Sequence, residues 1–132
     1  MNRIVNPPEL ARPRGFSHAI VAGNTVYLAG ETAHGPDGTL TAQTFVDQFD
    51  GAAQNLITAL GAAGGAPEDL VSLQVFVTDV AEYRASLGEL KNVWRERFGR
   101  HYPAMGLFGV SELVDPAAKV ELMGIAVLQG TP

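Results

Sequence analysis

The sequence predicts an α+β fold with the element order ββαβαββ, and three observations lead to this fold class. Two apolar runs flank Gly23-Asn24, which is typical of a tight hairpin. Two later segments repeat apolar residues at helical spacing, and strand-like stretches lie between and after them. A chain of 132 residues is long enough for a single core, so we expect one domain over 1–132, with 1–13 as an extended N-terminal segment.

The first half of the chain predicts a hairpin followed by a helix. We expect the first two strands at 19–22 and 25–29, and the glycines and proline of 34–39 indicate a loop. The helical pattern starts after Thr44 and is ended by Gly64-Gly65 and Pro67. Its apolar stripe consists of Phe45, Phe49, Ala52, Ala53, Leu56, Ile57 and Leu60.

The second half predicts a crossover and two final strands. Residues that alternate in character over 71–78 give one face that is more apolar than the other, which indicates a third strand. Helical spacing returns between Asp79 and Gly99, where the glycine suits a helix end. The stretches 104–110 and 119–128 are the last strands, joined by a turn at 114–116.

The predicted fold leaves one face of the sheet uncovered. Two helices cover one face of a five-stranded sheet, while the other face still carries Phe76 and apolar side chains of the last two strands. Since the chain has no spare element to cover this face, we expect a homo-oligomer with closed symmetry.

Composition narrows the classes of partner and compartment. The formal net charge is -5, and the lysines and arginines are scattered, so we do not expect nucleic acid as a partner. The absence of cysteine excludes disulfides and fits a reducing compartment, for which a cytoplasmic location is the expectation. No apolar run approaches 18 residues, so we expect no membrane segment.

Five segments in order along the chain carry a family resemblance. They are Arg14-Gly15-Phe16-Ser17-His18-Ala19, Leu28-Ala29-Gly30-Glu31, Val75-Phe76-Val77-Thr78-Asp79, the region from Arg97-Phe98 to Tyr102-Pro103-Ala104, and Lys119-Val120-Glu121 with Gly124-Ile125-Ala126-Val127. Together they resemble the reactive intermediate deaminase (Rid, or YjgF) family, also called L-PSP endoribonuclease-like. The resemblance implies a chorismate-mutase-like fold with a mixed sheet, assembled as a homotrimeric barrel with small-molecule clefts between subunits and no cofactor.

The resemblance also assigns the site residues. Glu121 matches the family's water-positioning glutamate and is the catalytic candidate. The ligand-binding candidates are Phe16, Ser17, Gly30, Glu31, Lys91, Met105 and Gly106. Met105 stands where the deaminase branch has an arginine that grips a carboxylate. Because a thioether supplies none of the hydrogen bonds of a guanidinium, the chain resembles a branch without that arginine, which argues against classical imino-acid deamination.

Simpler interpretations stay open for these residues. Glu121 could face solvent or pair with Lys119, and Met105 could be plain packing. Lys91 could be a solvated helix charge or a replacement cation for an anionic ligand. The neighbours Ser17 and His18 point to opposite sides of an extended strand, so they do not predict a nucleophile and base.

Two other patterns are not taken as sites. His18, His34 and His101 lack metal-ligand spacing, so no metal site is predicted. The glycines of 61–65 end a helix instead of opening one, unlike a phosphate loop.

Three function classes follow. The first is a cofactor-free, deaminase-like hydrolase of an imine or enamine, in which Glu121 orients water and backbone amides near Met105 and Gly106 stabilise developing negative charge. The second is a non-catalytic binding or sensor protein with an apolar cleft at Met105. The third is an endoribonuclease, which fits poorly with the acidic chain.

Overall fold

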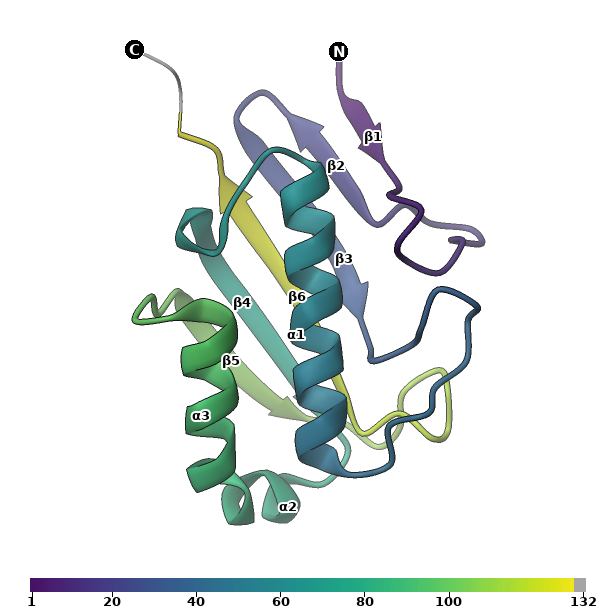
Figure 1. Ribbon diagram of the computed structural model, residues 1–132, viewed down its shortest axis with the longest axis vertical. Coiled ribbons are helices and arrows are strands. Elements are labelled where there is room, and N and C mark those ends of the chain that lie inside the picture. The colour runs from purple at the N-terminus through teal and green to yellow at the C-terminus, as the bar shows by residue number, and fades with distance from the viewer. Residues whose placement is uncertain (130–132) are drawn as a thin grey trace.

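The computed structural model describes residues 1–129, which form one mixed sheet covered by helices (Figure 1). The elements are β1 (Arg3–Val5), β2 (Ala19–Ala22), β3 (Thr25–Glu31), α1 (Phe45–Ala62), a short 3-10 turn η1 (Pro67–Asp69), β4 (Leu70–Val77), α2 (Val80–Ala85), α3 (Leu87–Phe98), β5 (Ala104–Gly109) and β6 (Val120–Val127). The strand order is β1-β2-β3-β6-β4-β5.

The arrangement confirms the predicted fold class. β4 and β5 pair in parallel, whereas β3 and β4 each pair antiparallel with β6. The two long helices, α1 and α3, lie on the same face of the sheet in Figure 1. The predicted hairpin is present, with β2 and β3 joined across Gly23-Asn24 and Gly23 at φ 60°, a conformation that favours glycine. Trimeric assembly stays a prediction.

The N-terminal segment corrects the expectation of a five-stranded sheet. Arg3–Val5 adds a sixth strand, which pairs antiparallel with β2 at the edge of the sheet. Val5 is buried, whereas Ile4 is exposed. A three-residue strand followed by prolines contains too little alternation to be recognised from sequence, because its formation depends on the neighbouring hairpin.

The second predicted helix is in fact two helices that meet at Ser86. The Asp79 side chain caps α2 by accepting a hydrogen bond from Glu82 N at 3.1 Å, and the Ser86 hydroxyl donates to Glu82 O at 2.8 Å. Ser86 ends α2 and begins α3. The apolar stripe continues across the break through Tyr83 and Leu87, so the periodicity alone could not reveal it.

Helix α1 contributes an apolar stripe to the core and also carries a buried polar residue, Gln48. Thr44 caps its start by accepting from Asp47 N at 3.1 Å. The stripe predicted from sequence is buried against the sheet except for Ile57, which is partly buried. Gln48, which was not predicted to be buried, is 2% exposed and donates to the carbonyls of Ala42 and Ala117, both at 3.0 Å. It also accepts from Lys119 N at 2.7 Å, so α1 fixes the start of β6.

The uncovered face of the sheet is apolar, as the sequence predicted. Phe76 and Phe108 stack there with ring centroids 5.7 Å apart. Phe108 is exposed, and so are three further large apolar side chains on the strands: Tyr27, Met123 and Val127. This face supports the expectation of self-association, because exposed apolar strands are usually covered in an assembly.

Candidate functional site

The predicted site residues fall in three places in one chain. Lys91 and Met105 line a cavity between α3 and β5, and Phe16, Gly30 and Glu31 line a second cavity beside the end of β3. Glu121 and Gly106 lie on strands at the open face of the sheet. Ser17 lines neither cavity.

The first cavity is mostly apolar and has a volume of about 610 Å³. Met105 is 48% exposed and belongs to its wall, and Lys91 is exposed at the same cavity. The remaining lining is aromatic or aliphatic: Phe49, Val75, Tyr83, Leu87, Leu90, Trp94, Tyr102 and Leu107. Such a surface suits an apolar or aromatic group, with Lys91 as the charged side chain of the lining.

The second cavity is smaller and more polar, with a volume of about 330 Å³. The Phe16 side chain at its wall is 52% exposed. Besides the predicted residues it is lined by Leu10, Ala11, Arg12, Arg14, His18, Thr32, His34, Gly38 and Asn55. The N-terminal segment therefore forms part of a cavity, which no pattern in the sequence indicated.

A buried ion pair lies beneath this second cavity. His18 Nδ1 is 2.7 Å from Glu31 Oε2, and the two residues are 4% and 5% exposed. His18 Nε2 is 2.7 Å from the Ala11 carbonyl oxygen, which can only accept, so Nε2 carries a hydrogen. Both ring nitrogens are thus engaged, and neither is free to act as a base for Ser17.

Burial governs the titration of Glu31. Loss of hydration raises the pKa of its carboxyl above the ordinary value, and the hydrogen bond from His18 opposes this rise. The negative charge of Glu121 adds a smaller increase. Glu31 is therefore committed to His18, and it shapes the cavity floor and its charge without being a free ligand group.

Glu121 has the properties of a general base on the open face. It is half-buried on β6, directly opposite Phe76 on β4. Burial raises the pKa of its carboxyl above the ordinary value. Lys119 pairs with Glu82 at 3.3 Å, so the structure does not show the Lys119–Glu121 pair considered from sequence. A carboxyl with a raised pKa and no ion-pair partner within residues 1–129 suits proton transfer.

Gly30 makes room for the Glu121 carboxylate. A Cβ at position 30 would lie 2.3 Å from Glu121 Oε2 and 2.7 Å from its Cδ. The register of β3 against β6 shifts between Leu28 and Glu31, so the strand bulges where it passes Glu121. Because position 30 is a glycine, the Glu121 carboxylate can lie against β3.

One chain does not bring Met105 and Glu121 together. Met105 is paired with Leu73, whose side chain is buried beneath the helices, whereas Glu121 is paired with Phe76 on the alternate face. Gly106 faces the open side, where a Cβ would lie 2.8 Å from the Phe108 ring, and β4 separates it from β6. The amides near Met105 and Gly106 therefore do not reach Glu121 within a single chain.

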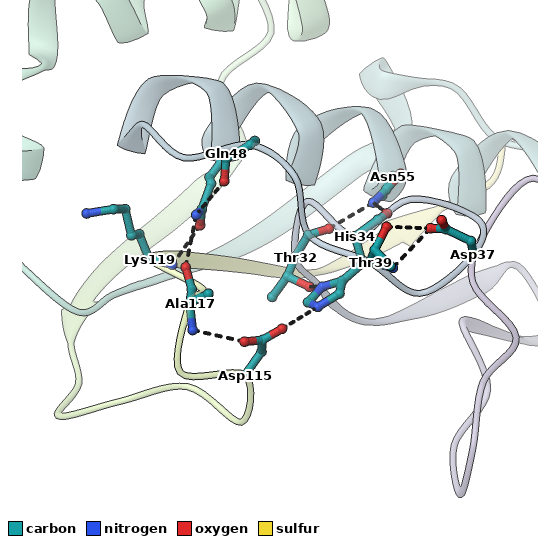
Figure 2. A network of polar contacts seen from close by, with 10 residues as sticks. Thr32, His34, Asp37, Thr39, Gln48, Asn55, Asp115, Ala117 and Lys119 are labelled. Carbon is teal, nitrogen blue, oxygen red and sulfur yellow. Dashed lines mark hydrogen bonds and ion pairs between the residues drawn. The ribbon is translucent and has the colours of Figure 1, made fainter.

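A polar network fixes the loops next to the second cavity (Figure 2). Asn55 Nδ2 donates to the carbonyls of Thr32 at 2.8 Å and His34 at 2.9 Å. His34 Nε2 lies 2.8 Å from Asp115 Oδ2, and its Nδ1 bonds to the Thr32 hydroxyl. The backbone N–H of Ala117 and then the His34 contact lower the pKa of Asp115. These bonds hold the loop after β3 against the loop before β6.

Within residues 1–129, no group of three or more histidine, aspartate or glutamate side chains is placed to hold a metal ion. In the same range, no helix is both long enough and apolar enough to cross a membrane.

Comparison with known proteins places this chain in a family. The model of the family described as Endoribonuclease L-PSP matches residues 8–128. A 2-iminobutanoate/2-iminopropanoate deaminase of Dermatophagoides farinae is 29% identical over 129 residues, covering 96% of this chain and 97% of that protein. A RutC family protein of Pyrococcus horikoshii is 28% identical and covers 86% of this chain and 88% of its own.

Solved structures with the same fold support this assignment. The crystal structure of a putative endoribonuclease from Thermotoga maritima has a TM-score of 0.87 and 28% identity, covering 98% of this chain and 100% of that one. The E. coli TdcF structure with bound serine has a TM-score of 0.85, covering 96% of this chain and 99% of its own; at 23% identity it supports the fold alone. The chain therefore belongs to the Endoribonuclease L-PSP family, the Rid or YjgF family that its sequence resembles.

Proposed function

We propose that this protein is a cofactor-free hydrolase of imine-like small molecules and that its site is completed between subunits of a homotrimer. The observation that carries the proposal is Glu121, a half-buried carboxyl of raised pKa set against Gly30 without an ion-pair partner in residues 1–129. The similarity to a relative named as an imine deaminase supports the same reaction class.

The proposed step is addition of water to a carbon–nitrogen double bond. Glu121 takes a proton from water as the oxygen attacks the imine carbon, and the nitrogen is protonated. Collapse of the resulting amino alcohol breaks the carbon–nitrogen bond, giving a carbonyl compound and ammonia. The raised pKa of Glu121 makes its carboxylate a stronger base than an exposed glutamate.

Assembly of copies accounts for the separation of the candidate residues. Met105 and Glu121 lie on opposite sides of the sheet, and β5, which carries Met105, is an edge strand. An edge strand and an apolar open face are both surfaces that a neighbouring copy can cover. The cavity at Met105 then holds the apolar part of a substrate whose reacting carbon lies near a neighbour's Glu121.

A non-catalytic binding protein is the second candidate. The apolar cavity of about 610 Å³ at Met105 favours it, because this cavity is large enough for a small aromatic metabolite. The catalytic candidate, Glu121, is not part of the lining of this cavity. RNA cleavage ranks third, since a net charge of -5 opposes binding of a phosphate backbone.

A turnover assay with a panel of imines separates the first two candidates. Imines generated in situ from alanine, leucine and phenylalanine are followed spectrophotometrically with the natural protein and with Met105→Arg. We expect the natural protein to accelerate hydrolysis and to prefer the larger apolar side chains, which fit the Met105 cavity. Met105→Arg should lose that preference, because a guanidinium replaces apolar lining. Activity in Met105→Arg alone would contradict the hydrolase proposal and favour the binding protein.

A further inference from the structure

Two arginines that line the second cavity have no hydrogen-bond or ion-pair partner among the described residues. Among residues 1–129, the arginine side chains that hydrogen-bond or ion-pair are Arg3 and Arg97. Arg12 and Arg14 line the cavity without such a partner. The other polar side chains of the lining already have partners: His18, Glu31, Thr32, His34 and Asn55.

The segment that carries these arginines is anchored at both ends. His18 binds the Ala11 carbonyl at 2.7 Å, immediately before Arg12, and the His18 N–H donates to Asn6 Oδ1 at 2.8 Å. Gly15, at φ 82°, turns the chain between Arg14 and Phe16 in a conformation that favours glycine. Anchoring lowers the entropic cost of using this segment to bind a ligand.

The charge of the cavity is positive. Glu31 is the one acid in its lining. In its pair with His18, one hydrogen lies on Nε2 toward the Ala11 carbonyl and a second lies between Nδ1 and the Glu31 carboxylate, so the pair carries no net charge. This leaves the guanidinium groups of Arg12 and Arg14 as the uncompensated charges, beside the Phe16 ring. A planar anion with an adjacent apolar part complements this lining, because a guanidinium binds a carboxylate through two parallel hydrogen bonds.

We propose that Arg12 and Arg14 form a carboxylate-binding subsite in this cavity, which takes the anionic end of a small organic acid while Phe16 contacts its apolar part. The inference rests on the proposed function only in treating that acid as the substrate or product of the site. Gly30 links this subsite to the proposed catalytic residue, since it lines this cavity and lies against the Glu121 carboxylate.

Direct binding of benzoate to the full-length protein tests the subsite. NMR titration gives the Kd of benzoate, with neutral benzamide as the uncharged analogue and inorganic phosphate as the competing anion. We expect benzoate to bind at least tenfold more tightly than benzamide, and Arg14→Ala to weaken benzoate at least tenfold. The Arg12→Ala/Arg14→Ala protein should bind benzoate no better than benzamide. Arg14→Lys should fall between, because it keeps the charge and loses the fork.

The control is Arg84→Ala, which removes an exposed arginine from α2, on the opposite side of the molecule from the N-terminal segment in Figure 1. It should leave benzoate binding unchanged. Unchanged binding in the double variant, or phosphate binding tighter than benzoate, would overturn the proposal. The readout is binding, so it can also be taken in a Glu121→Gln background, where benzoate should still bind. If the natural protein binds benzoate but hydrolyses none of the imines, the hydrolase proposal alone is overturned.

Discussion

Replacing Glu121 with glutamine is expected to lower the turnover number for imine hydrolysis by about 10²–10⁴-fold, the usual contribution of a positioned general base. Glutamine has nearly the same shape, so the contact with Gly30 and the packing against β4 should persist. KM should change little, because the step lost is proton transfer and not ligand binding. Steady-state kinetics on the best imine of the panel gives both values.

The matched control for this loss is Glu112→Gln, which neutralises an exposed glutamate in the loop before β6. It should retain full turnover. If Glu121→Gln keeps more than half of the natural rate, Glu121 is not the base, and the hydrolase proposal loses the observation that carries it.

His18→Leu is expected to be the most destabilising of the substitutions considered, by about 3–5 kcal/mol, the usual result of removing one partner of a buried ion pair. The change leaves the Glu31 carboxyl buried without its hydrogen bond and frees the Ala11 carbonyl. Urea unfolding monitored by circular dichroism measures the loss.

The loss should also depend on pH. Burial raises the pKa of Glu31, so its protonated form favours folding and its ionisation opposes it. Without His18 nothing offsets this effect, so the stability of His18→Leu should fall as pH rises through the folded-state pKa, and the loss should be greater at pH 8 than at pH 5. The double variant His18→Leu/Glu31→Leu should recover much of the stability, since it leaves no buried charge. Equal stability of His18→Leu and the natural protein would show that the pair contributes nothing.

Local patterns made much of the fold predictable. The Gly23-Asn24 hairpin and the stripe of α1 are encoded by neighbouring residues, so they could be recognised from sequence. The strand Arg3–Val5 and the break at Ser86 could not, because the first depends on pairing with β2 and the second interrupts no periodicity. Gln48 was missed since two of its three partners, Ala117 and Lys119, lie far away in the sequence.

The candidate site was less predictable than the fold. The family resemblance selected Glu121 and Gly30, and the structure places them in contact across two strands. Alternation along one strand predicts which of its own side chains share a face of the sheet. To predict that Met105 and Glu121 lie on opposite faces, the register of β4 with both β5 and β6 must also be known. Arg12 and Arg14 lie in a segment without secondary structure, where no periodicity predicts which side chains meet a cavity.

The central claim is that the Glu121 carboxylate activates water, and the pH dependence of kcat/KM tests it most directly. The natural protein is assayed across acidic to neutral pH, with the spontaneous rate subtracted at each point. We predict that kcat/KM rises with pH through an apparent pKa above that of an ordinary glutamate, because burial raises the pKa of Glu121. The same rising limb in Glu121→Gln, or a flat profile in the natural protein, would contradict the claim.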